Sequence, residues 1–393
     1  MQTMRADAVI IGGGVIGASI LYHLSARGMR CLLLEKGEAA DGTSGKCDGN
    51  IQCGDTEPGV DKDFVLQGQR LFDIIAPKLD IDVSWRSETS LMVFENEEEA
   101  EAGRNFVAQQ QANGIGIFFL DRKQLHECEP NLAEDLPGGC LFARDGRVNP
   151  LLLTISLIRQ AVRTGSEIRE RSAVLAISRD ALSGLFTVSG ADYEAVTPIV
   201  INAAGVYAPV IGEMLGVRIP IRPRQGQILV AESDAPLVSR TVTEFGYLMA
   251  KYGSGSWKRN VDPVTEENGV AMVVEPTEAG NFLIGSSRRF AGYDTTTSAE
   301  VLQALAGRML RFFPCAADIH IIRSYAGLRP FTEDHRAIIS ATEVKGFYVA
   351  AGHEGGGITQ SLITGQLMSE ILLGEKTCVP EEAFSLKRFM SRG

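Results

Sequence analysis

A glycine pattern near the start of the chain combines residue types and spacing that suit the binding of a diphosphate. The apolar run Ala8–Ile11 leads into Gly12, Gly14 and Gly17, a helical segment follows, and a second apolar run ends at Glu35. In such a unit the glycines allow a tight turn, close backbone approach to a pyrophosphate, and close packing of the helix on the strand. The N–H groups at the start of the helix favour phosphate, and Glu35 can accept hydrogen bonds from ribose hydroxyls. The unit predicts a dinucleotide site. It disfavours NADP, because the carboxylate would repel a 2′-phosphate, and it leaves FAD and NAD open.

Three later segments favour FAD over NAD. Residues 41–50 (DGTSGKCDGN) follow the second strand directly and either run along a flavin, with Ser44 bonding a phosphate, or form a surface loop. Residues 197–205 (TPIVINAAG) lead an apolar strand into a turn of small residues. Residues 346–352 predict a strand that ends in the loop HEGGG and a helix over 358–373. The N-terminus of that helix can stabilise negative charge at the flavin N1/O2 locus, and a nicotinamide enzyme has no need of a second such junction.

Composition excludes several classes of partner. The net charge is −11 and the sequence pI is about 5.1, with no basic block, so we expect neither nucleic acid nor an anionic membrane surface as a partner. The seven cysteines show no metal-ligand spacing, which predicts reduced thiols, a cytoplasmic location and no metal site. Residues 8–26 carry no formal charge, but their four glycines and strand-like first half argue against both a membrane span and a signal peptide.

Several segments together resemble a known family, the D-amino-acid-oxidase or glycine/sarcosine-oxidase type of FAD-dependent amine oxidoreductase. The resemblance covers nearly the whole chain and rests on residues 8–37, 138–150, 201–208, 222–230, 325–339 and 346–372. Within that family, the runs GHEGGGI and GKCDGN are most similar to the FAD subunits of heteromeric dye-linked dehydrogenases, such as opine oxidases, hydrogen cyanide synthase and proline or hydroxyproline dehydrogenases. The resemblance implies partner subunits that carry iron–sulfur centres or a second flavin, since this chain has no cluster motif; otherwise we expect a homo-oligomer.

The expected fold is α/β, with a Rossmann-type FAD-binding domain built on a parallel sheet and an inserted α+β substrate domain. The resemblance implies a discontinuous FAD-binding domain of residues 1–80, 146–216 and 322–393, and a substrate domain of residues 81–145 and 217–321. Strand-like runs at 227–231, 271–274 and 282–284 predict a mostly antiparallel sheet in the substrate domain. An acidic helix should begin after Asn96, its N-cap.

The residues expected to bind FAD lie in the glycine junctions and in the loops beside them. Val174, in the strand-like run 173–177, matches the position where such enzymes hold the adenine through backbone atoms. The full set is Gly12, Gly14, Val15, Ile16, Gly17, Glu35, Lys36, Thr43, Ser44, Lys46, Cys47, Val174, Ala203, Ala204, Gly205, Gly327, Arg329, Glu354, Gly355, Gly356, Gly357, Ile358 and Thr359. Asp48 beside Cys47 departs from the small or amide residues expected in that loop.

The expected catalytic residues are Arg329, Tyr247 and His353. An amino acid presents a carboxylate, and arginine binds a carboxylate through two parallel hydrogen bonds. In the family pattern the arginine of GLRP, here Arg329, binds the substrate carboxylate; a structural salt bridge is the alternative. The family often supplies a tyrosine to the same carboxylate, for which Tyr247 and Tyr252 are candidates. His353 can either face the substrate or hydrogen-bond to the backbone.

The sequence thus predicts oxidation of an amino acid or a secondary amine to the imine by hydride transfer to flavin N5. Proline-like, hydroxyproline-like, opine and D-amino acid substrates are the leading candidates, and the electron acceptor stays open. Sarcosine-type oxidases attach FAD through a cysteine in the segment matching 324–334, where this chain has none, so we expect non-covalent FAD. The alternatives are a 2-hydroxy-acid dehydrogenase on the same fold, a flavin-bound scaffold subunit without activity, and an NAD-dependent dehydrogenase.

Overall fold

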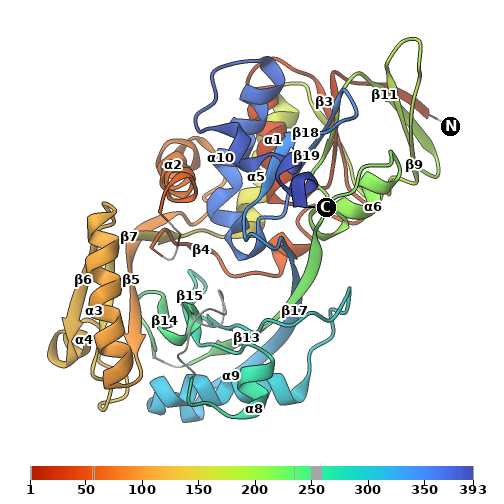
Figure 1. Ribbon diagram of the computed structural model, residues 1–393. Coiled ribbons are helices and arrows are strands. Elements are labelled where there is room, and N and C mark those ends of the chain that lie inside the picture. Colours follow the sequence, from red (N-terminus) through yellow and green to blue (C-terminus); the bar gives the residue numbers. More distant parts are fainter. Residues whose placement is uncertain (1, 55, 57, 234, 249–258, 393) are drawn as a thin grey trace.

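The described part of the chain is built on three β-sheets. The computed structural model describes residues 2–54, 56, 58–233, 235–248 and 259–392. Figure 1 shows a parallel sheet and its helices in the upper part of the view and a larger sheet in the lower part. The predicted α/β architecture, with a parallel sheet and a second, mostly antiparallel sheet, is confirmed.

The parallel sheet carries the strands that lead into the glycine junctions. In spatial order it contains β18 (Ile338–Ala341), β19 (Phe347–Ala351), β12 (Val200–Asn202), β2 (Ala8–Ile11), β3 (Cys31–Leu34) and β8 (Glu167–Arg169). All neighbours run parallel except β18, which is antiparallel to β19. The strands are short and apolar because both faces are covered, as is usual for parallel sheets.

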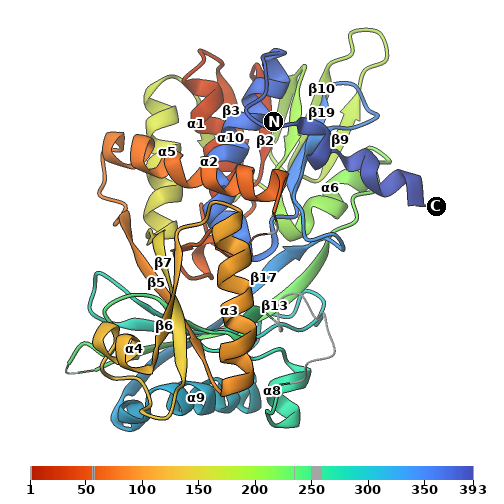
Figure 2. The ribbon, with the colours of Figure 1, turned by 60° about the vertical axis from the view of Figure 1, so that its left-hand side comes forward.

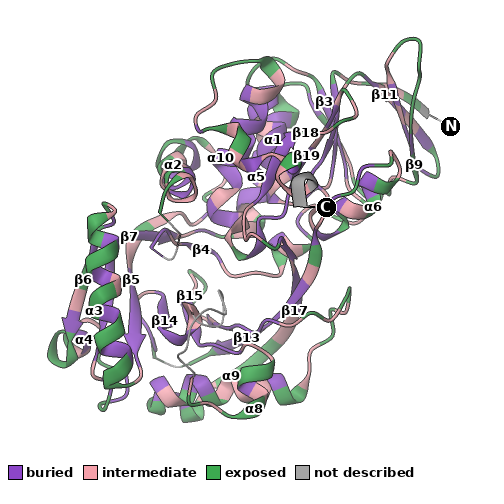
Figure 3. Cartoon of the chain, in the orientation of Figure 1, coloured by how far each residue is buried: buried purple, intermediate pink, exposed green. Residues whose placement is uncertain are grey.

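Helices cover one face of this sheet, and a small sheet covers the other. Ala8 and Ile10 pack in a core with α1 (Val15–Ser25), α2 (Val60–Ile75), α5 (Pro150–Arg163) and α10 (Gly357–Leu373). Val9 and Ile11 point the opposite way, towards α6 (Ala208–Glu213) and the small sheet. Figure 3 shows the strands of the parallel sheet buried between these layers.

The helices α1 and α10 lie in close contact because α10 has a glycine at the crossing. A Cβ atom on Gly365 would lie 2.6 Å from the carbonyl oxygen of Ser19 and 2.7 Å from the His23 ring. No larger residue fits there without separating the two helices. Since both helices begin at glycine junctions, this contact sets the position of one junction relative to the other.

The larger sheet is the frame of the second half of the fold. Its order is β17 (His320–Phe331), β13 (Arg222–Glu232), β16 (Phe282–Gly285), β15 (Val273–Pro276), β14 (Val242–Glu244), β5 (Arg86–Phe94), β7 (Gly138–Arg147) and β4 (Asn50–Ile51), and β6 (Ile117–Asp121) also pairs with β7. All these pairs are antiparallel except β14 with β5.

Helices also cover the larger sheet. Helix α9 (Ala299–Phe312) packs on β13 and β16. Helix α3 (Glu97–Ala112) packs beside β6 and β7, as Figure 2 shows. The short helices α4 (Arg122–Cys128) and α8 (Pro263–Glu267) complete this part. The predicted N-cap of α3 is confirmed, because the Asn96 side chain accepts a hydrogen bond from the Glu99 N–H. Among the described residues, no helix combines the length and the apolarity that a membrane span needs.

A four-stranded sheet was not expected from the sequence. It has the order β1 (Gln2–Arg5), β11 (Tyr193–Thr197), β10 (Phe186–Ser189) and β9 (Ala176–Arg179). The strand predicted over residues 173–177 therefore begins only at Ala176, and Val174 precedes it. The reason is local. The Tyr193 hydroxyl lies 3.1 Å from the Ser172 carbonyl oxygen and 3.3 Å from that of Ala173. This side chain therefore hydrogen-bonds to carbonyl groups that would bond to a neighbouring strand if β9 began earlier.

Candidate active site

The three junctions singled out in the sequence lie at one edge of the parallel sheet. Strands β19, β12 and β2 are neighbours and run parallel, so their carboxyl ends meet at the same edge. These ends lead into Gly352, Ala203 and Gly12 respectively. Such an edge, where strand ends open between helices, is the usual ligand site of an open α/β sheet. Gly12 and Gly352, 340 positions apart in the sequence, thus share one site.

Gly12 is required by the turn between β2 and α1. Its φ is +114°, and a Cβ atom on it would lie 2.5 Å from the carbonyl oxygen of Ala203. The neighbouring β12 turn is held by Asn202, whose side-chain oxygen accepts from the Ala204 N–H at 3.2 Å, and Gly205 there has φ +55°. The two turns therefore pack against each other without side chains between them.

Two helices at this edge begin after a glycine, which has no side chain to cap the N-terminus. Helix α1 begins after Gly14 and α10 begins after Gly356, and neither has an acidic residue in its first turn. The Val15 N–H donates to Ser44 Oγ at 3.0 Å. Uncapped N–H groups with the positive end of a helix dipole attract anionic groups. The residues present therefore fit a dinucleotide that has a diphosphate at one end and an electron-rich ring at the other.

Glu35 lies at the end of β3, beside the first junction. Its carboxylate accepts hydrogen bonds from the Gly13 and Gly37 N–H groups, both at 2.7 Å. The Glu35 carbonyl accepts from the Ser172 N–H, which brings the segment containing Val174 alongside. The next residue, Lys36, has its Nζ 3.2 Å from the centroid of the Tyr207 ring.

The loop containing Thr43, Lys46 and Cys47 packs on β17. Thr43 Oγ1 donates to the Leu328 carbonyl at 2.6 Å, and a Cβ atom on Gly327 would lie 2.6 Å from the Lys46 carbonyl oxygen. Burial, followed by the negative charge of Asp48, raises the pKa of the Cys47 thiol well above its ordinary value. Cys47 is therefore a neutral thiol at pH 7 and not a nucleophile.

Arg329 lies between the larger sheet and the α10 junction. Its Nη1 donates to the Ser287 carbonyl at 2.8 Å and its Nη2 lies 3.0 Å from Ser286 Oγ. A Cβ atom on Gly355 would lie 3.7 Å from Arg329 Nε, so the guanidinium is adjacent to the α10 junction. Burial and the nearby Arg288 lower its pKa to about 10, which leaves it cationic at neutral pH. Neutral partners thus fix the fork of Arg329 without neutralising it.

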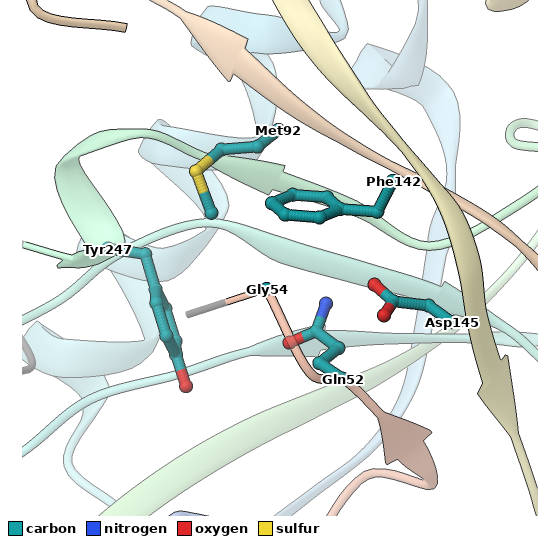
Figure 4. Close-up of a pocket in the computed structure, with 6 residues that line it drawn as sticks. All are labelled: Gln52, Gly54, Met92, Phe142, Asp145 and Tyr247. Atoms are coloured by element: carbon teal, nitrogen blue, oxygen red, sulfur yellow. The ribbon is translucent and has the colours of Figure 1, made fainter. Parts of the chain in front are cut away.

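Tyr247 lines a small pocket on the larger sheet. Figure 4 shows its ring on one side of the pocket, with Met92 and Phe142 across from it and Gln52 and Asp145 at the polar side. The guanidinium carbon of Arg288 lies 4.2 Å from the centroid of the Tyr247 ring. Tyr247 therefore joins the pocket to the arginine side chains near Arg329. Tyr252, the other candidate, lies outside the described residues.

The structure places His353 and Glu354 in supporting positions. His353 is 4% exposed, its Nε2 lies 2.9 Å from Thr364 Oγ1, and burial lowers its pKa to about 3. Glu354 forms an ion pair with Arg224, and its Oε2 lies 2.8 Å from His335 Nδ1. The neutral His353 ring is thus bonded to α10. The glycines after Glu354 are partly accessible, while Ile358 and Thr359 are buried.

Sequence reasoning missed two arginines of the site, Arg224 and Arg288. Strand β13 pairs with β17 so that Arg224 lies opposite Arg329, and an isolated bridge pairs Gln225 with Arg289. The sequence signal that could have found them is the pair of arginine-containing runs RPRQGQ and GSSRRF, each of which borders an apolar strand. No cluster of three or more histidine, cysteine or acidic residues suited to a metal exists among the described residues.

Comparison with known proteins identifies the family of the chain. Residues 7–371 match the family model DAO, described as FAD dependent oxidoreductase. The chain belongs to this family. As a DAO-family enzyme, it is a FAD-dependent oxidoreductase of the amino-acid oxidase and dehydrogenase group.

Relatives within the DAO family match over almost their whole length. Glycine oxidase of Geobacillus kaustophilus (strain HTA426) is 27% identical over 100% of this chain and 99% of its own. The crystal structure of glycine oxidase from Geobacillus kaustophilus covers 98% of this chain and 99% of its own at a TM-score of 0.88. Hydrogen cyanide synthase subunit HcnC of Pseudomonas aeruginosa is 26% identical, covering 98% of this chain and 96% of the relative. An opine oxidase subunit of Agrobacterium tumefaciens (strain Ach5) is 26% identical, covering 98% of both.

Proposed function

We propose that this enzyme oxidises an amino acid or a secondary amine to the imine, with non-covalent FAD as cofactor. Proline-like, hydroxyproline-like, opine and D-amino acid substrates belong to this class. The observation that carries the proposal is Arg329, a half-buried guanidinium held by Ser286 and Ser287 at the α10 junction, which forms no ion pair with a carboxylate among the described residues. A substrate carboxylate supplies the anion that this position lacks.

The roles of the chain follow from the site. FAD, when bound, supplies the two-electron acceptor. The α1 N-terminus holds the diphosphate, Gly12 and Gly14 let the backbone approach it, and the α10 N-terminus offers N–H groups to the ring. Arg329 fixes the substrate carboxylate, and Tyr247 lines the adjoining wall.

The surroundings of Arg329 favour an amine that enters the reaction neutral. Burial raises the pKa of Tyr325, and burial together with neighbouring negative charge raises those of Cys47 and Glu275 well above ordinary values. The Tyr325 hydroxyl and the Cys47 thiol therefore keep their protons at neutral pH and offer no strong base. The nitrogen lone pair of a deprotonated amine then drives loss of the hydride, and solvent takes the N–H proton.

We therefore expect kcat to rise with pH as the substrate ammonium deprotonates. Across a panel of amines, the midpoint of the pH profile should follow the pKa of the amine. A profile independent of the amine pKa contradicts this mechanism.

Anaerobic mixing of the purified yellow protein with substrate classes tests the function. Amino acids and N-alkyl glycines should bleach the flavin absorbance, and 2-hydroxy acids of the same side chains should not. Bleaching by hydroxy acids alone supports the 2-hydroxy-acid dehydrogenase. Absence of bleaching by every compound supports the scaffold subunit.

We further propose that the enzyme works with a partner subunit that accepts its electrons. The supporting fact is that two relatives, HcnC and the opine oxidase chain, are themselves named as subunits. Residues 1–80, 146–216 and 322–393 form the FAD-binding domain of this proposal, residues 81–145 and 217–321 the substrate domain, and the cysteine pattern supports a cytoplasmic location. Purification from the native host should recover an iron–sulfur or flavin protein in stoichiometric amount. A homo-oligomer that turns over rapidly with O2 contradicts the proposed partner.

A further inference from the structure

Glu354 is an acidic side chain beside the start of α10. It lies three positions before Gly357, the first residue of the helix, and it is 6% exposed. The N–H groups and the positive dipole end of a helix N-terminus attract a carboxylate of the chain as they attract an anionic ligand. A Glu354 carboxylate that was free to turn towards α10 would therefore compete with the ring that the proposed function places there.

Two basic side chains hold the Glu354 carboxylate. It forms a buried ion pair with Arg224 of β13, and its Oε2 lies 2.8 Å from Nδ1 of His335, in the turn that follows β17. Burial and the nearby Arg288 and Arg329 lower the pKa of Arg224 to about 9, so Arg224 is still cationic at neutral pH. Among the described residues, no backbone N–H donates to this carboxylate. Its oxygens are thus directed to Arg224 and His335 instead of the N–H groups of α10.

The backbone of Glu354 indicates that its side chain is needed. Glu354 has a φ of +50° and His335 one of +56°, in the left-handed region that residues with a side chain disfavour. The three glycines that follow Glu354 have no such φ, although glycine adopts it without cost. Strained residues persist where their surroundings hold them, and they gather at functional sites. A glycine in place of Glu354 would relieve the strain, so we infer that the carboxylate has a role that glycine cannot fill.

The turn that carries His335 is itself fixed from two directions. Asp334 is paired with Arg388, with Oδ2 and Nε 2.6 Å apart. Arg336 is paired with Asp61 of α2, and its Nε donates to Asp61 Oδ1 at 2.7 Å. The His335 ring is therefore presented to Glu354 by a turn that is anchored on both sides of it.

The ion pair between Glu354 and Arg224 also balances charge between the flavin site and the substrate site. Arg224 lies opposite Arg329 in the register of β13 and β17, and a Cβ atom on Gly355 would lie 3.7 Å from Arg329 Nε. Loss of Arg224 alone would leave a negative charge beside α10, and loss of Glu354 alone would leave a positive charge. Because reduction adds negative charge to the flavin ring, the two losses should change its reduction potential in opposite directions.

We propose that Arg224 and His335 withhold the Glu354 carboxylate from the N-terminus of α10, so that the N–H groups there stay available to the flavin ring of FAD. Glu354 and Arg224 are positioning residues and take no part in the hydride transfer. This inference rests on the proposed function, which places the ring at this N-terminus. It follows that a change of either charge alone disturbs the flavin, whereas a change of both together does so much less.

Three variants of the holoenzyme test the pair: Arg224→Gln, Glu354→Gln and the double variant. Anaerobic reduction in equilibrium with a reference dye measures the reduction potential of the flavin. Arg224→Gln should lower this potential, Glu354→Gln should raise it, and the double variant should return towards the wild-type value. Stepwise dilution, followed by the fluorescence of released FAD, measures the Kd. Arg224→Gln should raise the Kd about 10-fold, and the added Glu354→Gln should bring it back to within about 3-fold of wild type.

His335→Gly offers a second route to the same effect. Glycine accepts the φ of +56°, and the half-buried ring is removed while the ion pair with Arg224 stays in place. His335→Gly should raise the Kd for FAD by a smaller factor than Arg224→Gln, and Glu354→Gln should reverse this rise as well.

Arg308→Gln is the matched control. Arg308 is also a buried arginine with carboxylate partners, Glu244 and Glu95, but it lies on α9 beside the larger sheet. Its substitution should lower the melting temperature and leave the Kd for FAD and the reduction potential unchanged.

The possible outcomes separate this inference from the proposed function. Potential shifts of the same sign in Arg224→Gln and Glu354→Gln, or a double variant that binds FAD no better than Arg224→Gln, overturn the inference. If Arg224→Gln yields no folded protein, His335→Gly decides, and a loss of FAD affinity that Glu354→Gln does not reverse overturns it. The proposed function is then still tested by the bleaching of the flavin with amines. A wild-type chain that binds no FAD overturns both.

Discussion

At the scale of single residues, the site depends on how Arg329 is held. Ser286 and Ser287 occupy two of its donors, which fixes the plane of the guanidinium without neutralising it. A fixed plane lets arginine offer two parallel hydrogen bonds to a carboxylate, whereas lysine offers a point charge on a flexible stem. The geometry of Arg329 thus matters for the site in addition to its charge.

Arg329→Lys should therefore raise the KM for the substrate by about 10- to 100-fold, because the bidentate geometry is lost while the charge remains. Steady-state kinetics with the best substrate of the panel measures the change, and the flavin absorbance per protein shows whether the cofactor is retained. An unchanged KM in a fully flavinated Arg329→Lys protein would remove Arg329 from the substrate site.

Gly12 gives a second prediction at this scale. Gly12→Ala combines a φ of +114° with a Cβ only 2.5 Å from the Ala203 carbonyl oxygen, so the strand junction must open. We expect purified Gly12→Ala to carry little FAD. Gly28→Ala is the matched control, since Gly28 also has positive φ, +84°, but no atom within 4 Å of the added Cβ. Full flavin content in Gly12→Ala would contradict the role of this turn.

At the scale of elements, the contact between α1 and α10 contains two buried histidines. Burial lowers the pKa of His23 to about 3, with a further contribution from Arg27, and burial lowers that of His353 to about 3. In the unfolded chain both protonate near pH 6.5, whereas in the folded protein they stay neutral. The unfolded state therefore binds more protons between pH 6.5 and 3. Their contribution to stability is complete above pH 6.5 and is lost as the pH falls towards 3.

The free energy of unfolding should accordingly fall by about 1.4 kcal/mol per pH unit for each histidine below pH 6. Urea unfolding at a series of pH values measures the slope. His353→Gln should remove the share of the slope that comes from His353, which is about half of what the two histidines contribute together. Substitution of the exposed His320 by Gln should leave the slope unchanged. Equal slopes in wild type and His353→Gln would show that His353 protonates without cost in the fold.

The elements that the sequence predicts well are those with local signals. The strand, glycine turn and helix at residues 8–25 and 347–373 follow from apolar runs, from Gly12 and from the helical spacing after 358, and α10 begins within one residue of the expected start. The small sheet of β1, β9, β10 and β11 was missed because β1 pairs with residues about 190 positions away and no local pattern encodes that contact. The meeting of Arg224 with Arg288 was missed for the same reason.

At the scale of the whole molecule, the proposed FAD site is built from parts that are distant in sequence. The three junctions come from β2, β12 and β19, and the loop of residues 43–49 ties this edge to β17 through Thr43. A ligand that binds only the folded chain stabilises it in proportion to the logarithm of its concentration over its Kd. FAD should therefore contribute to the stability of both sheets at once.

We expect acid precipitation to release all the flavin into the supernatant, because the segment 324–334 contains no cysteine and Cys47 is a protonated thiol. The apoprotein should unfold at lower temperature than the holoprotein, and added FAD should raise the midpoint in a concentration-dependent way. Yellow colour that stays with the precipitate, and a flavin-labelled peptide in its digest, would show a covalent link instead.

The order of the strand ends along the chain has a consequence for biosynthesis. The turn after β2 emerges from the ribosome early, the turn after β12 near the midpoint, and β19 with α10 only over residues 347–373. A nascent chain paused before residue 357 thus contains the first two turns of the proposed flavin site but lacks helix α10. Cofactor capture must then wait until nearly all of this sequence has been translated, and FAD supply after synthesis, rather than during it, should govern how much of the enzyme matures.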